Sequence, residues 1–109
     1  MSEVLPAEAD QAPTQAERQH AQARLDRLWQ RGTDFLGTPY ASLGGAMSWL
    51  SERNLVSAIS NAGGFGVIAC GAMEPERLAE EIAATRAMTD RPFGVNLITM
   101  HPRLDDLIK

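Results

Sequence analysis

Apolar residues in this sequence form short runs that favour strands, separated by longer stretches with helical spacing. The first strand is predicted at 39–43 and runs into a glycine turn at 44–47. Two further runs, at 65–70 and 93–98, are almost continuously apolar. A continuous apolar run is typical of a strand that is buried on both faces, as the strands of parallel sheets are.

Two amphipathic helices are predicted between these strands. The first begins at a cap formed by Ser48 or Ser51 and is closed by the glycines at 63–64. Its apolar side consists of Leu55, Ile59 and Ala62. The second begins at 74–76, where a proline and two acidic residues suit the amino end of a helix, and it ends near 89–90. Strands and helices that alternate in this way imply parallel pairing with right-handed crossovers, the repeating unit of barrels and doubly wound sheets.

A separate helix is predicted in front of the first strand. Residues 1–13 contain few large apolar groups and are interpreted as a flexible leader. A capping box at 14–17 begins the helix, which we expect to run to about Arg31 and to stop at Gly32. Residues 14–36 are therefore assigned to this helix and a linker. The apolar face of the helix is formed by Leu25, Leu28 and Trp29.

Size, charge and cysteine content argue against several classes of protein. A chain of 109 residues forms one domain at most, and its net charge of −4, with acids interleaved among the basic residues, argues against nucleic-acid binding. Cys70 is the single cysteine, which excludes an internal disulfide, and the sequence holds no ligand cluster for a metal such as zinc. The sequence has no secretory signal and no apolar run of the ~20 residues that a membrane helix needs, so we expect a cytoplasmic protein.

Candidate chemistry lies at the carboxyl ends of the predicted strands, where ligands of parallel α/β folds bind. Three segments qualify: 44–48, 70–72 and 96–101. The glycine pair in the first is either a tight turn or a place where the backbone approaches a planar ligand closely. In the second case the backbone amides of Ala46 and Met47 are available as donors.

Asn96 is a polar amide within an otherwise apolar strand. Burial of such a group without a partner costs roughly 1–3 kcal/mol, so we expect it to be paired. A neighbouring backbone group and a cofactor ring are equal alternatives for that partner. The other polar cluster, formed by Glu76, Glu80 and Glu81, is interpreted as the solvated face of a helix.

Three blocks of the sequence resemble a known family. They are 43–49 (LGGAMSW), 55–66 (LVSAISNAGGFG) and 92–97 (PFGVNL), in family order and with family-like spacing. The chain from about Gly37 to Lys109 is therefore similar to the nitronate monooxygenases, formerly called 2-nitropropane dioxygenases. The flavin-dependent enoyl-acyl-carrier-protein (enoyl-ACP) reductases share the same blocks.

The resemblance implies a TIM (β/α)8 barrel that holds FMN at the carboxyl ends of its strands, with 37–109 as the first three strands. The flavin contacts of the family map onto Gly45, Ala46, Met47 and Asn96. The family's catalytic histidine and its phosphate-binding loops lie further along the chain than this sequence reaches, so no catalytic residue is assigned.

The implied function is the oxidation of an alkyl nitronate, a small-molecule substrate, by oxygen in an FMN-dependent monooxygenase. An enoyl-ACP reductase on the same scaffold and a non-catalytic fragment or association module are the alternatives. A barrel of this kind needs ~250 residues, and the chain ends within a helix predicted from Leu104, Leu107 and Ile108. We therefore expect a partial barrel that is inactive alone and that self-associates through its open sheet edge.

Overall fold

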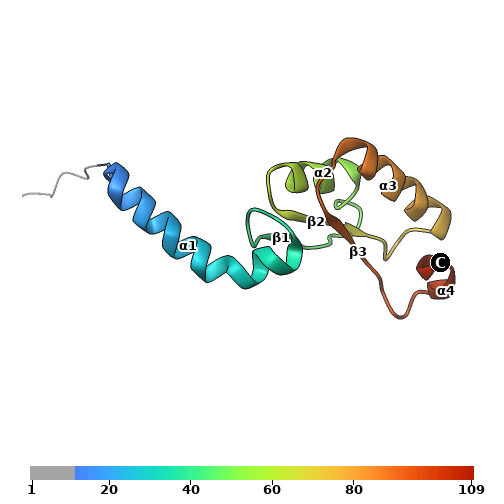
Figure 1. Cartoon of the computed structure of the whole chain (residues 1–109). Helices are drawn as coiled ribbons and strands as arrows, with labels where there is room; N and C mark the ends of the chain where they lie inside the picture. Colours follow the sequence, from blue (N-terminus) through green and yellow to red (C-terminus); the bar gives the residue numbers. More distant parts are fainter. Residues whose placement is uncertain (1–11) are drawn as a thin grey trace, which may run out of the picture.

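The structure is a computed structural model that describes residues 12–109. In chain order it contains α1 (Gln15–Leu36), β1 (Leu43–Gly44), α2 (Arg53–Asn61), β2 (Phe65–Ala69), α3 (Pro75–Met88), β3 (Phe93–Asn96) and α4 (Leu104–Ile108) (Figure 1). The leader predicted at 1–13 lies outside the described residues except for its last two. The predicted order, one helix followed by β-α-β-α-β and the start of a further helix, is confirmed.

The three strands form one parallel sheet in the order β1-β2-β3. Helices α2 and α3 pack side by side on the same face of this sheet (Figure 1). Both helices therefore return the chain to the starting end of the sheet, which is what parallel pairing requires. The predicted α/β class with parallel strands is confirmed.

Strand β1 is shorter than the segment 39–43 that the sequence predicted. Only Leu43 and Gly44 pair with β2, so the strand begins where the predicted one ends. Upstream of β1 the backbone makes other contacts. The Tyr40 N–H donates to the Gly63 carbonyl, and the Thr38 hydroxyl donates to the Tyr40 carbonyl. This stretch is therefore held against the loop after α2 and cannot join the ladder.

The core lies between β2 and the two helices on its face. It consists of Val56, Ile68, Cys70 and Leu78, with Phe93 and Val95 among the partly buried side chains around it. Helix α2 comes close to β2 because Gly66 has no side chain. A Cβ at this position would lie 2.5 Å from the Val56 carbonyl oxygen.

The buried side of α2 differs from the predicted one. Its buried residues are Val56, Ser57 and Ser60, whereas Leu55 and Ile59 are half-buried and Ala62 is exposed. Ser60 accounts for the difference, since its hydroxyl donates to the Pro92 carbonyl and accepts the Gly66 N–H. Ser60 thus faces the core because it bonds the backbone of β2 and the backbone in front of β3. The spacing of apolar residues cannot predict that a serine lies on this side of the helix.

Helix α1 begins at the predicted capping box but does not stop at Gly32. It continues to Leu36, and Gly37 forms a left-handed cap with φ 67°. Gly32 serves packing instead, because a Cβ there would lie 2.7 Å from the Ala41 Cβ. One glycine inside a helix costs only about 1 kcal/mol, which a further helical turn and a glycine cap offset.

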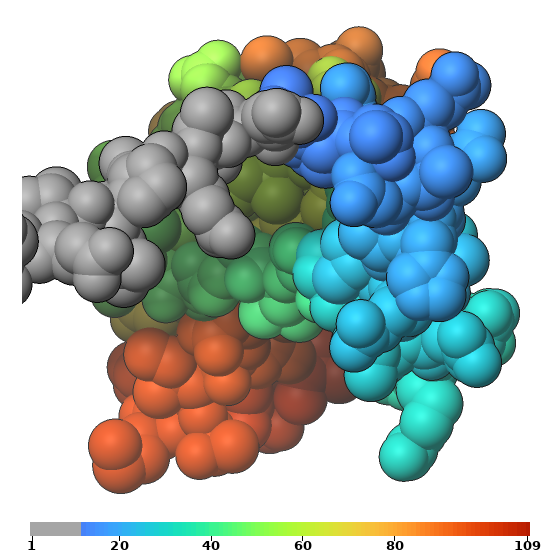
Figure 2. Space-filling model, turned by 90° about the vertical axis from the view of Figure 1, so that its left-hand side faces the viewer, coloured from blue at the N-terminus to red at the C-terminus, as the bar shows by residue number. Residues whose placement is uncertain are grey.

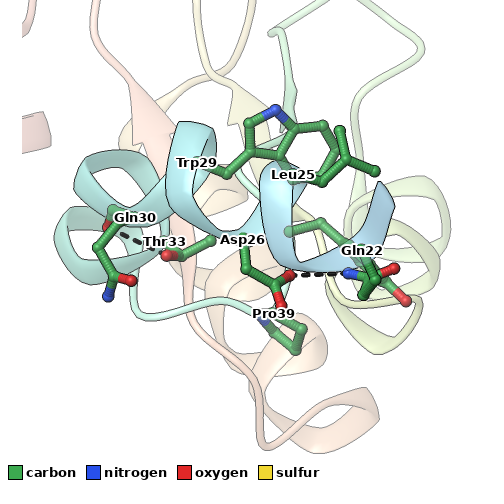
Figure 3. A pocket seen from close by; sticks show the side chains of 8 residues that line it. Gln22, Leu25, Asp26, Trp29, Gln30, Thr33 and Pro39 are labelled. Carbon is green, nitrogen blue, oxygen red and sulfur yellow. Dashed lines mark hydrogen bonds between the residues drawn. The ribbon is translucent and has the colours of Figure 1, made fainter. Parts of the chain in front are cut away.

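Helix α1 extends away from the sheet (Figure 1), and none of its residues is buried. Figure 2 shows its outer surface in blue and cyan. The Trp29 ring meets the Tyr40 ring edge-on, with 6.3 Å between the centroids. A hollow beside these rings is lined by Leu25 and Asp26, among others, and lies next to the chain entering β1 (Figure 3). Within residues 12–109, no helix combines the length and the apolar character needed to cross a membrane.

The sheet face opposite α2 and α3 leaves apolar side chains uncovered. Leu43 is 59% exposed, and Phe65 and Val67 are only half-buried. We expect the purified 109-residue chain to elute in size-exclusion chromatography above the mass of a monomer, and increasingly so at higher concentration, because this face and the strand edges associate. A single monomeric peak at all concentrations, with cooperative unfolding, would contradict this prediction.

Candidate functional site

The parallel register brings the three candidate segments to one edge of the sheet. Gly66 of β2 is paired with Gly44 of β1 on one side and with Phe93 of β3 on the other. The chain therefore leaves all three strands at the same edge, which we call the carboxyl edge. Gly45 follows β1, and Asn96 is the last residue of β3. They therefore lie about 10 Å apart in the direction across the sheet, with β2 between them.

Asn96 lies on the face of the sheet that is turned away from α2 and α3. A Cβ at Gly94 would meet the side chains of Phe65 and Val67 on that face, and residues two apart in a strand share a face. Asn96 is exposed, so the expectation that burial forces it to find a partner is wrong for the described residues. Its amide is instead accessible to a ligand that approaches this face.

The segment 45–47 is open to solvent at the same edge. A Cβ at Gly45 would contact nothing within 4 Å, and both Ala46 and Met47 are exposed. The Met47 amide is not available as predicted, because it donates to the Ser51 hydroxyl oxygen at 2.9 Å. A flat ligand can therefore approach the backbone at Gly45 and Ala46, while Met47 offers its side chain.

Ser51 organises this loop, which we call the 45–51 loop. Besides accepting from Met47, the Ser51 hydroxyl donates to the Gly45 carbonyl at 3.3 Å. The Ser51 N–H donates to the Met47 carbonyl, and the Ser51 carbonyl accepts the N–H of Ala69 at 3.0 Å. One buried serine therefore closes the loop on itself and joins it to the end of β2.

The cap of α2 is Glu52, and not Ser48 or Ser51 as predicted. Its carboxylate accepts the N–H of Asn54 at 3.0 Å and that of Leu55 at 3.3 Å. A serine in front of a helix can satisfy either the amides of the helix or those of the preceding loop. Here the negative charge of the glutamate suits the positive end of the helix, and the serine is left for the loop.

Trp49 stands within the 45–51 loop in a left-handed backbone conformation, with φ 68° and 84% of the residue exposed. This conformation is uncommon for a bulky residue. Its side chain forms one wall of a hollow of about 360 Å³ between the loops after β1 and β2. The hollow is further lined by Glu52, Ala69, Ala72, Met73, Glu74 and Arg77. An exposed aromatic ring at such an edge is suited to stacking on a planar ligand, and no local pattern around Trp49 predicted this role.

Glu81 was interpreted as part of a solvated helix face, and this is wrong: its side chain is fully buried. The carboxylate is paired with Arg53 at the start of α2 and with Arg77 one turn earlier in α3. Hydrogen bonds from Arg53 hold the pKa of the Glu81 carboxyl below its ordinary value and outweigh burial, which acts in the opposite direction. The pair therefore stays ionised in the folded chain at neutral pH.

The start of α4, directly after the third segment, is held against the start of α3 by an exposed ion cluster. Arg103 contacts Glu74 and Glu76 at 3.1 Å each, and the hydrogen bonds that its guanidinium donates, first to Glu76 and then to Asp106 and Glu74, raise its pKa. The Arg103 N–H also donates to Nδ1 of His101. The Nδ1 atom of His101 is therefore engaged within its own turn.

The sequence of this chain is similar to those of known proteins. The family profile described as nitronate monooxygenase matches residues 30–109. A (3aS,4S,5R,7aS)-5-hydroxy-7a-methyl-1-oxo-octahydro-1H-indene-4-carboxyl-CoA dehydrogenase of Mycobacterium tuberculosis is 40% identical over 65 residues, which are 60% of this chain and 18% of that protein. A probable nitronate monooxygenase of Staphylococcus saprophyticus is 35% identical over 78 residues, 72% of this chain and 22% of that protein.

Solved structures give a similar result. FabK from Thermotoga maritima superimposes with a TM-score of 0.70 and 45% sequence identity, covering 72% of this chain and 25% of that chain. The chain thus spans about a fifth of the length of the curated relatives it matches and a quarter of this structural neighbour. The match begins within α1, so residues 15–29 of this helix lie outside the family profile.

Proposed function

This chain belongs to the nitronate monooxygenase family, and from that premise we propose that it supplies the flavin-ring side of an FMN-dependent oxidoreductase acting on alkyl nitronates. In this proposal its three strands are the first three of a (β/α)8 barrel. The relatives named above are a nitronate monooxygenase and a dehydrogenase, which are both oxidoreductases. The substrate class and FMN are the parts that go beyond family membership.

One observation carries the proposal: an exposed amide and an unobstructed glycine face the same edge of the sheet. Asn96 ends β3 on the face away from the helices, and a Cβ at Gly45 would meet nothing within 4 Å. An isoalloxazine ring is flat and carries hydrogen-bonding groups along its edge. The edge therefore fits a flavin ring, with room for its plane at Gly45 and a polar side chain for its rim.

Each residue of the site has a different contact with the flavin ring. In the proposed complex Asn96 hydrogen-bonds the polar rim of the flavin, and Gly45 and Ala46 let the backbone approach its plane. The Met47 side chain covers part of the ring and excludes water from it. FMN, when bound, supplies the electron transfer between a nitronate and oxygen, while the protein positions it.

Replacement of Asn96 by alanine tests this assignment. We expect Asn96→Ala to weaken FMN binding about tenfold, since loss of a hydrogen bond or two is worth on the order of 1.4 kcal/mol. The measurement is quenching of FMN fluorescence when the flavin-free protein is titrated. Asp90→Ala, in the exposed turn before β3 and so at the opposite edge of the sheet, serves as the control and should leave the affinity within about twofold. Equal affinities of wild type and Asn96→Ala would refute the role of Asn96.

Reduction of an enoyl thioester is the second candidate, because FabK shares 45% identity over the superimposed region. FabK is an enoyl-ACP reductase, and that reaction needs a nicotinamide reductant and no oxygen. Oxygen uptake with an alkyl nitronate, measured beside NAD(P)H consumption with an enoyl thioester, separates the two reactions. Activity with the thioester alone would replace the nitronate proposal while leaving the flavin assignment in place.

A further inference from the structure

Glu81 of α3 is a buried carboxylate that has no part in the proposed flavin contacts. One of its oxygens accepts two hydrogen bonds from Arg53, from the backbone N–H and from Nε, both at 3.0 Å. The other oxygen accepts from Nη2 of Arg53 at 2.8 Å and also contacts Arg77. Burial of a charge costs several kcal/mol unless the charge is fully paired. Loss of these contacts would therefore destabilise the packing of α3 against α2.

The contact with Arg53 fixes the place where α2 begins. Arg53 is the first residue of α2, and the first N–H groups of a helix have no partner within the helix. Glu52 satisfies the N–H groups of the next two residues, and Glu81, from a different helix, satisfies that of Arg53. The amino end of α2 is thus capped by one local carboxylate and one that lies 28 residues away in the sequence.

The 45–51 loop ends directly in front of this anchor. Its first end is fixed by β1, and Ser51, two residues before Arg53, closes the loop by bonding to Met47 and Gly45. The Ser51 carbonyl in turn accepts the N–H of Ala69 at the end of β2. The position of Arg53 therefore determines where Ser51 can sit and, through Ser51, the shape of the loop.

The other end of α2 has attachments of its own. The Asn61 side-chain amide donates to the Met88 carbonyl, and its oxygen accepts the hydroxyl of Thr89. The Ser60 hydroxyl donates to the Pro92 carbonyl. Because these contacts do not involve Glu81, loss of the Glu81 charge should release only the amino end of α2 and the loop before it.

We propose that Glu81 is a positioning residue for the flavin-binding edge: by holding Arg53, it keeps the 45–51 loop in the shape that presents Gly45 to Met47 to the ligand. The proposal rests on the proposed function only for the identity of that ligand. The effect on the loop follows from the contacts of Glu81 alone.

Glu81→Gln tests the proposal, because it keeps the shape of the side chain and removes its charge. Glu80→Gln is the matched control, since Glu80 is the preceding residue, is exposed, and makes a single long ion pair within residues 12–109, with Arg77 at 3.5 Å. We expect amide hydrogen exchange at Met47 and Ala69 to become at least tenfold faster in Glu81→Gln. The amide of Ala62, which bonds within the far end of α2, should change less than twofold. FMN should bind about tenfold more weakly to Glu81→Gln and with unchanged affinity to Glu80→Gln.

The pattern of exchange separates a positioning role from a general contribution to stability. Equal acceleration at Met47, Ala69 and Ala62 would overturn the proposal, as would faster exchange at the loop with unchanged FMN affinity. If the wild-type protein does not bind FMN, the proposed function fails, while the exchange data still decide whether Glu81 holds the loop.

A milder variant covers the case in which Glu81→Gln does not fold. Arg53→Lys keeps the backbone N–H and the positive charge, but a lysine cannot reproduce the two-pronged contact of the guanidinium. We expect the same pattern of exchange, about threefold faster at Met47 and Ala69 and unchanged at Ala62. Unaltered exchange at the loop in Arg53→Lys would overturn the proposal.

Discussion

Gly66→Val is expected to lower the free energy of unfolding by about 3 kcal/mol, the upper part of the range for overpacked cores. A Cβ at Gly66 would lie 2.5 Å from the Val56 carbonyl oxygen and 2.9 Å from its Cγ1. These atoms cannot yield cheaply, because one belongs to the helix backbone and the other to a fully buried side chain. The variant must therefore push α2 away from β2, which opens the core and displaces the 45–51 loop.

Urea unfolding followed by circular dichroism measures this loss, at protein concentrations below the onset of self-association. Gly45→Ala is the control, since it also adds a side chain to a glycine but one that meets nothing within 4 Å. We expect the stability of Gly45→Ala to remain within about 0.5 kcal/mol of wild type. Similar losses in both variants would show that the glycines matter through backbone freedom and not through the close approach of α2.

Ile68→Ala is expected to destabilise the chain by about 2–5 kcal/mol. Ile68 is fully buried at the centre of the core, where it meets residues of both α2 and α3. Its truncation removes apolar contacts and leaves a cavity that two helices anchored at their ends cannot readily close. Such a loss is a large part of the stability of a small domain, so we expect a marked fall in the urea midpoint.

Val67→Ala, one residue earlier in the same strand, provides the comparison. Its side chain lies on the opposite face of β2 and is half-buried, so truncation should cost roughly 1 kcal/mol. The order of the two effects follows from which face the helices cover. A larger loss for Val67→Ala than for Ile68→Ala would mean that the main core lies on the other side of the sheet.

The order of elements and the parallel pairing could be predicted from the sequence because both depend on local patterns. Continuous apolar runs favour buried strands, and the chain segments between them have helical spacing and recognisable ends. The capping box at Thr14 and Glu17 is of the same kind, since both partners lie within one helical turn. The position of the candidate site also followed, because parallel strands place their carboxyl ends at one edge.

Several predictions failed where two signals in the sequence were equivalent and only a distant contact chose between them. Gly32 and Gly37 can each end a helix, and the close approach of Ala41 uses the first for packing. Ser51 and Glu52 can each cap α2, and the end of β2 gives Ser51 another role. The apolar spacing and the capping preferences around these positions do not distinguish the two alternatives.

Local sequence determined which segments of this protein become helices and strands, and which of their ends could meet a ligand. The tertiary structure alone decided that Glu81 is buried, that α2 turns Ser60 to the core, and that the Ser51 carbonyl bonds to the end of β2. The physical reason is that a polar side chain can be satisfied equally well by water, by its own helix or by a remote partner. Which of these it finds depends on groups that are brought together only when α2, α3 and the sheet have packed.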